Sequence, residues 1–292
     1  MFCEVNMIKK IPRKVVKLLS IIMFIIGFIF FCIWQNNSIT ISKYNYVNSK
    51  IPQNFNNFTI AHVSDLHNKM FGKDQIKLLN KVKSISPDII VITGDLVDRR
   101  KYNLDTALMF ISGAVKISPV YYVSGNHEAW SGKFPLIKEK LIDMGVHILD
   151  DKSFKLSNGS SSIHLLGLSD PDFLTYNYRD GTDTSKMEEQ LNMWSTDKNF
   201  KILLSHRPEL FHLYVQNNMD LIFTGHAHGG QFRIPGIGGV VAPDQGIFPN
   251  YTGGSYNKGL STMFVSRGLG NSIFPIRIFN RPEIIKVTLK TQ

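Results

Sequence analysis

Two apolar patterns alternate along the chain after residue 57. Short, nearly continuous apolar runs at residues 58–64, 88–93 and 120–124 are typical of buried β-strands, while apolar residues recur at helical spacing over residues 75–82 and 104–115. Strands that are apolar on both faces belong to sheets that are covered on both sides. The pattern therefore predicts a sheet with helices packed against it.

The second half of the chain is richer in predicted strands. The strands are expected at residues 162–168, 201–205, 221–224, 239–242, 262–266 and 284–289, and helices at residues 187–194 and 209–216. Pro208 would occupy the first turn of the last helix, where a missing N–H is tolerated. Strand–helix alternation followed by more strands predicts an α/β fold, a four-layer α/β/β/α sandwich of two mixed sheets flanked by helices.

A longer apolar run precedes these elements. Residues 18–34 carry no charge, and with their flanks they approach the roughly 20 residues that a helix needs to cross a bilayer. We predict an N-terminal transmembrane helix over residues 18–36. A cleaved signal peptide is the first alternative, but no A-x-A cleavage site follows the run. A buried core helix is the second, but the run is too long and is apolar all round.

The residues on either side of this run predict its orientation. Segment 1–17 is basic, with Lys9, Lys10, Arg13, Lys14 and Lys17. Because positively charged flanks stay cytoplasmic, we expect a single-pass membrane protein with a cytoplasmic N-terminus and the large domain on the extracytoplasmic side. The polar, Asn-rich residues 37–57 are interpreted as a tether, with an edge strand as the alternative, and residues 58–292 as one domain.

Composition narrows the classes of partner. The formal net charge is +10, but beyond the N-terminal segment the basic residues form no run of like charges. Nucleic-acid-binding proteins gather such residues on one face or stripe, so no nucleic-acid partner is expected. The two cysteines, Cys3 and Cys32, both lie in or before the apolar run. The domain that follows is therefore expected to use neither a disulfide nor a thiolate ligand.

Five polar motifs occur at the ends of predicted strands. They are Asp65-Leu66-His67, Gly94-Asp95-Leu96-Val97-Asp98-Arg99, Gly125-Asn126-His127-Glu128, Ser205-His206 and Gly225-His226-Ala227-His228. Each alone has an ordinary explanation, since Gly-Asp and Gly-Asn are common in turns and a single histidine at a strand end is usually structural. Ligands of open α/β sheets collect beyond the carboxyl ends of strands, where all five motifs lie. Together they predict a metal site, and a donor set without thiolate favours Mn, Fe or Zn.

The order of these motifs, D-x-H, G-D-x-x-D-R, G-N-H-E, H and G-H-x-H, resembles that of the calcineurin-like metallophosphoesterases over about residues 57–288. The stretch GHAHGGQFRIPGIGG and residues 266–270 resemble the membrane-anchored bacterial subgroup of that family. The resemblance implies two divalent metal ions, with Mn expected and Fe, Zn or Ni as alternatives. One metal would take Asp65, His67, Asp95 and His228, and the other Asp95, Asn126, His206 and His226, so that Asp95 bridges them.

The resemblance also implies catalytic roles. His127 would donate a proton to the leaving oxygen or bind the phosphate, and Asp98 would orient it. A hydroxide that bridges the metals would attack the phosphorus directly, without a covalent intermediate. Arg99, Arg207 and Arg267 lie beside motif residues and are candidates for phosphate binding, with an ordinary structural role as the alternative.

These inferences predict a membrane-anchored, metal-dependent hydrolase of a phosphodiester or pyrophosphate. A lipid-linked substrate fits an anchored site, which meets membrane substrates at high effective concentration. One alternative is a UDP-2,3-diacylglucosamine diphosphatase of lipid A biosynthesis, a reaction linked to one branch of the subgroup, but it needs a cytoplasmic site. A phosphomonoesterase and a non-catalytic scaffold are the others. No protein partner is predicted, and substrate choice is expected to depend on loops 170–183 and 243–259.

Overall fold

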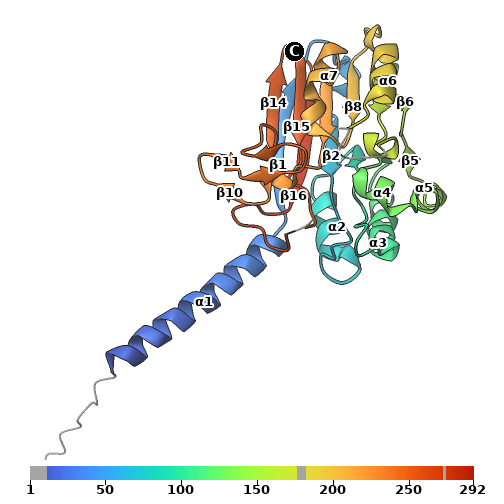
Figure 1. Ribbon diagram of the computed structural model, residues 1–292. Helices are drawn as coiled ribbons and strands as arrows, with labels where there is room; N and C mark the ends of the chain where they lie inside the picture. Colours follow the sequence, from blue (N-terminus) through green and yellow to red (C-terminus); the bar gives the residue numbers. More distant parts are fainter. Residues whose placement is uncertain (1–11, 176–181, 272–273) are drawn as a thin grey trace, which may run out of the picture.

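Two six-stranded sheets packed face to face form the body of the molecule (Figure 1). The computed structural model describes residues 12–175, 182–271 and 274–292. Helices cover the outer face of each sheet, so the predicted four-layer α/β/β/α architecture is confirmed.

The first sheet has the strand order β1-β16-β2-β3-β4-β5. Its strands are β1 (Thr40–Val47), β2 (Thr59–Val63), β3 (Ile89–Thr93), β4 (Val120–Val123), β5 (His147–Ile148) and β16 (Glu283–Lys290). Strands β2 to β5 are parallel, whereas β16 pairs antiparallel with β2. The outer face carries α2 (Ile76–Lys83), α3 (Leu104–Ala114) and α5 (Phe134–Asp143). Because its central strands are parallel, their carboxyl ends lie at one edge of the sheet.

The second sheet has the strand order β14-β15-β9-β8-β7-β6. Its strands are β6 (Lys152–Asn158), β7 (Ser161–Gly167), β8 (Lys201–Leu204), β9 (Leu221–Thr224), β14 (Gly254–Lys258) and β15 (Ser261–Val265). Its four central strands are parallel, and the edge strands β6 and β14 are antiparallel to their neighbours. Helices α6 (Ser185–Ser195) and α7 (Phe211–Gln216) cover its outer face.

An apolar layer between the sheets receives side chains from both. Val91 and Val123 of the first sheet join Ile202 and Phe223 of the second in one fully buried cluster. Ile90, next to Val91 in the chain, belongs instead to the core beneath the helices. Both faces of these strands are therefore buried, which explains why their sequences are apolar throughout.

Most predicted elements are present with ends shifted by one or two residues. The predicted strand at 239–242 is wrong, because two short hairpins lie there: β10 (Arg233–Ile234) with β11 (Gly238–Gly239), and β12 (Val241–Ala242) with β13 (Gly246–Ile247). Pro208 begins a 3-10 turn rather than α7 itself. The other 3-10 turns are Gln53–Phe55, Lys73–Gln75, Pro171–Phe173 and His228–Gly230.

Some elements were not predicted from the apolar pattern. Strands β6 and β14 lie at the edge of the second sheet with most side chains exposed or half-buried, and helix α4 (Asn126–Ser131) spans a single motif. Residues 37–57, interpreted above as a tether, contain the edge strand β1, which pairs with β16 over eight residues. The first sheet therefore begins before residue 58, and a tether of that length is wrong.

Helix α1 (Arg13–Asn37) projects from the body (Figure 1). Among the described residues it is the one helix long and apolar enough to cross a membrane, and its most apolar window has none of its residues buried in the protein. Its 25 residues would extend over roughly 37 Å at 1.5 Å per residue. Residues 1–11, which include Lys9 and Lys10 of the basic segment, lie outside the described residues.

Candidate metal centre

Seven side chains from the five motifs come together where the two sheets end. Motifs follow β2, β3 and β4 in the first sheet and β8 and β9 in the second, so the carboxyl ends of five strands surround one site. None of the seven is more than 6% exposed: they are Asp65, His67, Asp95, Asn126, His206, His226 and His228. Parallel strands in both sheets explain why motifs up to 163 residues apart meet.

Most of these side chains are held by an unusual backbone conformation. Five of the seven have a positive φ, namely Asp65 (53°), His67 (46°), Asp95 (54°), His226 (63°) and His228 (46°). Residues with a Cβ adopt this region at an energetic cost, and such residues cluster at functional sites. The strand-end turns therefore aim the side chains inward at the expense of local stability.

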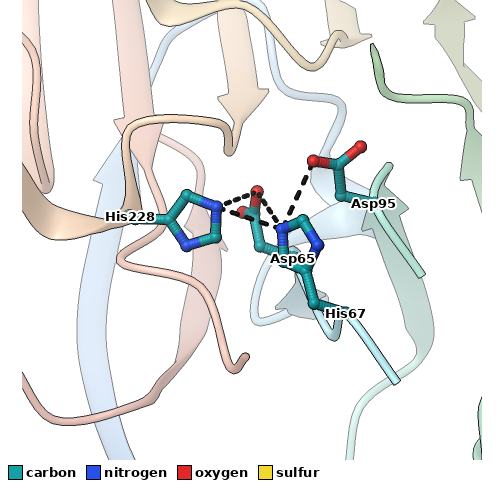
Figure 2. A group of neighbouring side chains, drawn as sticks. All are labelled: Asp65, His67, Asp95 and His228. Carbon is teal, nitrogen blue, oxygen red and sulfur yellow. Dashed lines mark hydrogen bonds and ion pairs between the residues drawn. The ribbon is translucent and has the colours of Figure 1, made fainter. Parts of the chain in front are cut away.

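The first group of side chains consists of Asp65, His67 and His228, with Asp95 beside it (Figure 2). Nε2 of His67 lies 3.0 Å from Nε2 of His228 and 3.4 Å from Oδ2 of Asp95. Nε2 of His228 lies 3.6 Å from Oδ1 of Asp65. Two imidazoles and two carboxylates therefore converge on one small volume.

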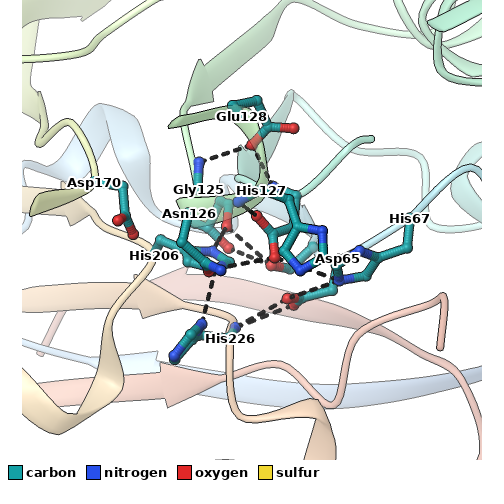
Figure 3. Close-up of polar contacts among 12 residues, drawn as sticks. Asp65, His67, Gly125, Asn126, His127, Glu128, Asp170, His206 and His226 are labelled. Atoms are coloured by element: carbon teal, nitrogen blue, oxygen red, sulfur yellow. Dashed lines mark hydrogen bonds and ion pairs between the residues drawn. The ribbon is translucent and has the colours of Figure 1, made fainter. Parts of the chain in front are cut away.

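The second group consists of Asn126, His206 and His226 (Figure 3). Nε2 of His206 lies 2.9 Å from Oδ1 of Asn126, 3.2 Å from Nδ1 of His226 and 3.4 Å from Oδ2 of Asp95. The same Asp95 oxygen thus lies 3.4 Å from a histidine of each group. Asp95 is the side chain that the two groups share.

The charges in the cluster follow from burial and mutual contact. Burial raises the pKa of Asp65 to about 6, while it lowers the pKa of His67 to about 3. Asp95 is also buried, but the neighbouring imidazoles of His206 and His127 hold its pKa well below the usual range. Burial opposes protonation of His206, but contact with Asp95 raises the pKa of His206 to about 10. The cluster therefore concentrates negative charge at Asp95.

The donor atoms of the cluster fit divalent cations. The Nε2 atoms of His67 and His228 face each other, and the Nδ1 atoms of both rings have no hydrogen-bond partner within the described part of the chain. Buried polar atoms without partners are costly. Divalent cations of the Mn, Fe and Zn type accept imidazole nitrogen together with carboxylate and amide oxygen. The seven side chains could therefore hold two such ions around Asp95.

His127 lies at the edge of the first group. Its ring packs edge-on against that of His67, with 4.4 Å between the ring centroids, and its backbone N–H donates to Asp95 Oδ1 over 2.8 Å. Nδ1 of His127 accepts the N–H of Arg99 at 3.2 Å, whereas Asp98 Oδ1 is 3.8 Å away. Asp98 is held instead by two hydrogen bonds from the Arg100 side chain. A backbone N–H, rather than Asp98, thus makes the hydrogen bond to this ring.

The three candidate arginines have different surroundings. Arg207 is 1% exposed and binds the carboxylates of Asp170 and Asp172, and the half-exposed Arg267 binds Glu283 at 2.9 Å. Arg99 is exposed, and its guanidinium stacks on the Trp130 ring at 4.1 Å. A pocket of about 130 Å³ opens onto the cluster, and its lining includes Arg99 together with the following residues: Asp95, Arg100, Asn126, His127, Trp130, His226, His228 and Pro243.

Two residues near the cluster have contacts that the sequence analysis did not anticipate. The Glu128 carboxylate accepts the backbone N–H groups of Asp95 (2.7 Å), Gly125 (2.8 Å) and Val97 (3.2 Å), so it ties two motif loops together. Asp244 Oδ2 lies 2.9 Å from Nε2 of His226. Glu128 could have been noticed because it belongs to the Gly-Asn-His-Glu motif, but no local signal marks Asp244.

These loops approach so closely that glycine is required. Gly94 has a φ of 83°, and a Cβ built on it would lie 2.5 Å from the backbone nitrogen of Gly125. Any larger residue at position 94 would separate Asp95 from the Asn126 loop. The glycine before Asp95 thus positions the residue that the two groups share.

A two-sheet α/β sandwich with buried aspartate, asparagine and histidine side chains at its strand ends defines a class, the metal-dependent hydrolases of phosphoesters. Residues 58–230 match the family model described as calcineurin-like phosphoesterase. The chain belongs to this family, in agreement with the resemblance of its motifs. It is a metal-dependent phosphoester hydrolase.

Relatives of similar length support the assignment. The uncharacterized metallophosphoesterase YkuE of Bacillus subtilis is 28% identical over 88% of this chain and 87% of its own. Phosphodiesterase YaeI of Escherichia coli is 26% identical over 80% of this chain and 82% of its own. A protein of Danio rerio described as a transmembrane protein with metallophosphoesterase domain is 28% identical over 82% of this chain and 55% of its own.

Proposed function

We propose that the protein is a membrane-anchored phosphodiesterase or pyrophosphatase with two divalent metal ions. The observation that carries the proposal is the position of Asp95, whose Oδ2 lies 3.4 Å from a histidine of each group. A carboxylate between two groups of nitrogen and oxygen donors is suited to bridge two ions. When bound, such a pair of cations polarises phosphoryl oxygens and lowers the pKa of water.

We assign the ligands by group. Asp65, His67, Asp95 and His228 would hold one metal, and Asp95, Asn126, His206 and His226 the other; convergence of their donor atoms supports both sets. Mn is the metal we expect, because the donors are nitrogen and oxygen without thiolate, and Fe, Zn and Ni are compatible with the same set.

His127 is the proposed proton donor to the leaving oxygen. Because its Nδ1 accepts the N–H of Arg99, a neutral ring would carry its proton on Nε2. Burial lowers the pKa of His127, which favours such a neutral ring at neutral pH. Asp98, whose Oδ1 lies 3.8 Å from the ring, would add negative charge beside it, and Arg99 at the pocket would bind phosphate oxygens. Arg207 and Arg267 remain candidates for phosphate binding only if they leave their carboxylate partners.

The anchor supports a membrane-associated substrate. Helix α1 has the length and apolar composition of a membrane span, and the described basic residues Arg13, Lys14 and Lys17 lie at its N-terminal end. We propose that the N-terminus is cytoplasmic and that the catalytic domain faces the extracytoplasmic side, where a lipid-linked phosphoester would reach it. The relative YaeI is described as a phosphodiesterase, which favours diester over monoester chemistry.

The test is a substrate and metal panel on the full-length protein. Metal-stripped protein would be supplied in turn with Mn, Fe, Zn, Ni or Mg and assayed on bis(p-nitrophenyl) phosphate and on p-nitrophenyl phosphate. We expect metal-dependent hydrolysis that is faster on the diester. Faster hydrolysis of the monoester would assign a phosphomonoesterase, and activity that survives metal removal would refute the two-metal mechanism.

His127→Ala separates proton donation from metal binding. The variant should retain both metals and lose about 10²–10⁴-fold in rate, with the largest loss on substrates whose leaving group is a poor one. Exposed His212, on α7, provides a matched control, since His212→Ala should change neither property. Loss of metal from the His127 variant would make this residue a ligand instead.

A further inference from the structure

The face of the body from which α1 emerges carries an apolar rim. We define the rim by five exposed side chains: Ile234, Ile237, Phe274, Ile276 and Phe279. Ile237 is 69% exposed and Phe279 is 53% exposed. Exposed apolar residues gathered in one patch are typical of an interaction surface.

The rim is continuous although its residues come from two segments. A β-bridge joins Phe232 to Ile278, and the N–H of Arg233 donates to the Ile278 carbonyl at 3.0 Å. The β10–β11 hairpin and Phe279 also line the same surface hollow. The hairpin and the segment 274–279 therefore form one surface.

Helix α1 packs directly against this rim. Phe31 of α1 contacts Phe279 with 5.6 Å between ring centroids, and the Arg281 guanidinium lies 4.8 Å from the Trp34 ring. Phe30, next to Phe31 in the chain, is 68% exposed and belongs to the apolar part of the helix. If α1 spans the bilayer as proposed above, the rim lies at the depth where acyl chains give way to headgroups, a depth that suits tryptophan and arginine.

A basic groove adjoins the end of α1. We define it by Asn37 at the end of α1, Lys77 and Lys81 of α2, and Arg281. Its volume is about 550 Å³, and no carboxylate lines it within the described part of the chain. In Figure 1, α2 and the β10–β11 hairpin both lie near the point where α1 joins the body. Basic side chains at this depth attract the anionic headgroups of a membrane surface.

We propose that this face docks on the lipid bilayer, with the apolar rim inserted at the interface and the basic groove on anionic phospholipid headgroups. The proposal rests on the proposed function, since it requires α1 to span the membrane. It adds that the catalytic body lies against the bilayer instead of moving freely on its anchor. Insertion of a few apolar side chains together with attraction to anionic lipid is the usual basis of interfacial binding.

The docking face also leads toward the metal centre. The β12–β13 hairpin follows the β10–β11 hairpin in the chain, and its turn includes Pro243 and Asp244. Pro243 lines the pocket over the cluster, and Asp244 contacts His226. A docked rim would therefore fix the orientation of the pocket relative to the membrane, as hydrolysis of a lipid-linked phosphoester requires.

The test measures the depth of three positions in the full-length protein. In a background with Cys3→Ser and Cys32→Ser, single substitutions Ile237→Cys, Met23→Cys and Leu260→Cys would carry an environment-sensitive fluorophore. Met23 is 71% exposed on α1 and reports insertion of the anchor. Leu260 is 85% exposed in the turn after β14 and shares a groove with Lys50, beyond the far end of β1. The eight residues of β1 place that end roughly 26 Å from α1.

Each outcome in phosphatidylcholine–phosphatidylglycerol vesicles has one meaning. We expect nitroxide-labelled lipids to quench the fluorophores at positions 23 and 237, with a blue shift at both, but not the fluorophore at position 260. Quenching at position 23 without quenching at position 237 would overturn the docking while leaving the anchor and the hydrolase in place. No quenching at position 23 would overturn the anchor, while diester hydrolysis by the same vesicles tests the catalytic proposal separately. A blue shift at position 237 that needs a high protein density, without lipid quenching, would assign the rim to a second copy of the chain.

A charge-reversal pair tests the basic groove. Lys77→Glu with Lys81→Glu should weaken the quenching at position 237 in anionic vesicles and should have little effect in pure phosphatidylcholine. Lys152→Glu with Lys155→Glu makes the same charge change on exposed residues of β6, at the edge of the other sheet, and should have no effect. Equal quenching in both lipids, unaffected by the first pair, would refute headgroup binding by the groove.

Discussion

The two groups of proposed ligands are held in place by different means. In the second group the outer ring nitrogens have partners: Nδ1 of His206 lies 2.7 Å from the Thr93 carbonyl oxygen, and Nε2 of His226 lies 2.9 Å from Asp244 Oδ2. Outer partners of this kind fix the ring orientation and tautomer of a metal-binding histidine. The second group is therefore oriented largely by hydrogen bonds.

The first group is oriented by its backbone. Nδ1 of His67 and Nδ1 of His228 have no hydrogen-bond partner among the described residues, and Asp65, His67 and His228 all have φ between 46° and 53°. Their turns are braced by glycines and by backbone hydrogen bonds, such as that from the N–H of Gly270 to the Asp65 carbonyl at 2.6 Å. A remote side chain can therefore tune the second group, whereas only a change in the loops themselves can tune the first.

Asp95→Asn should have the largest effect, because Asp95 belongs to both groups. Loss of its charge should weaken both metals and reduce diester hydrolysis by on the order of 10³-fold. Metal content after desalting, measured by mass spectrometry, and the hydrolysis rate check this. Asp105→Asn, on an exposed residue in the first turn of α3, is the matched control. A variant that keeps two equivalents of metal and full turnover would exclude the bridging role.

Glu128→Gln should come next, because Glu128 ties the loops of the two groups without contributing to the donor atoms of either. A glutamine has one acceptor oxygen, so at least one of the three N–H groups bound by the carboxylate would lose its partner, at about 1–3 kcal/mol. Thermal unfolding and metal titration should show a lower melting temperature and weaker binding of both metals. Exposed Glu139 on α5 offers the control Glu139→Gln, and identical behaviour of the two variants would show that the tie is dispensable.

The fold and the gathering of the motifs could be predicted because their signals are local. Buried parallel strands appear as apolar runs, and a polar motif at each strand end must meet the others once the strands are parallel. The backbone conformation of His67 or His228 could not be predicted, since a positive φ at a histidine leaves no mark in composition. The Asp244 contact was equally hidden, because it depends on how two short hairpins fold back onto the second sheet.

The membrane-facing surface illustrates the same limit. The apolar run of α1 could be recognised from its length, but the contact of Phe31 with Phe279 joins residues 248 positions apart. Residues 37–57 were misjudged as a tether because the apolar and polar residues of β1 resemble those of a polar linker. Its pairing with β16, which is far away in the chain, decides its structure.

Asp244→Ala should separate the two groups. Removal of the partner of His226 should lower affinity for one of the two metals by about 10–100-fold and leave the other unchanged. Calorimetric titration of metal-stripped protein with Mn would resolve the two binding steps. Asp244→Asn keeps an oxygen that can accept from Nε2 of His226, so it should restore part of the affinity. Equal weakening of both steps, or none, would contradict the independence of the groups.

Asp150→Asn should have the smallest effect, confined to the pH dependence of stability behind the second group. Asp150 Oδ1 accepts the N–H of Ser124 at 2.8 Å, just before the Asn126 loop, and burial raises the pKa of Asp150 from 3.8 to about 7. Below about pH 4 the carboxyl is protonated in the folded and the unfolded chain, so it contributes no pH dependence. Between about pH 4 and pH 7 only the unfolded chain releases the proton, so folding loses free energy as the pH rises.

The substitution removes this loss because asparagine does not titrate. Between about pH 5.5 and pH 8 the wild-type protein should lose on the order of 1 kcal/mol or more relative to the variant, since each unit of pKa shift corresponds to about 1.4 kcal/mol. Denaturant unfolding of the metal-loaded proteins at several pH values measures the difference, and the slope rather than the absolute stability is compared. Parallel pH profiles would mean that Asp150 is ionised in the folded protein, and the support of the Asn126 loop would then rest on a charged rather than a neutral side chain.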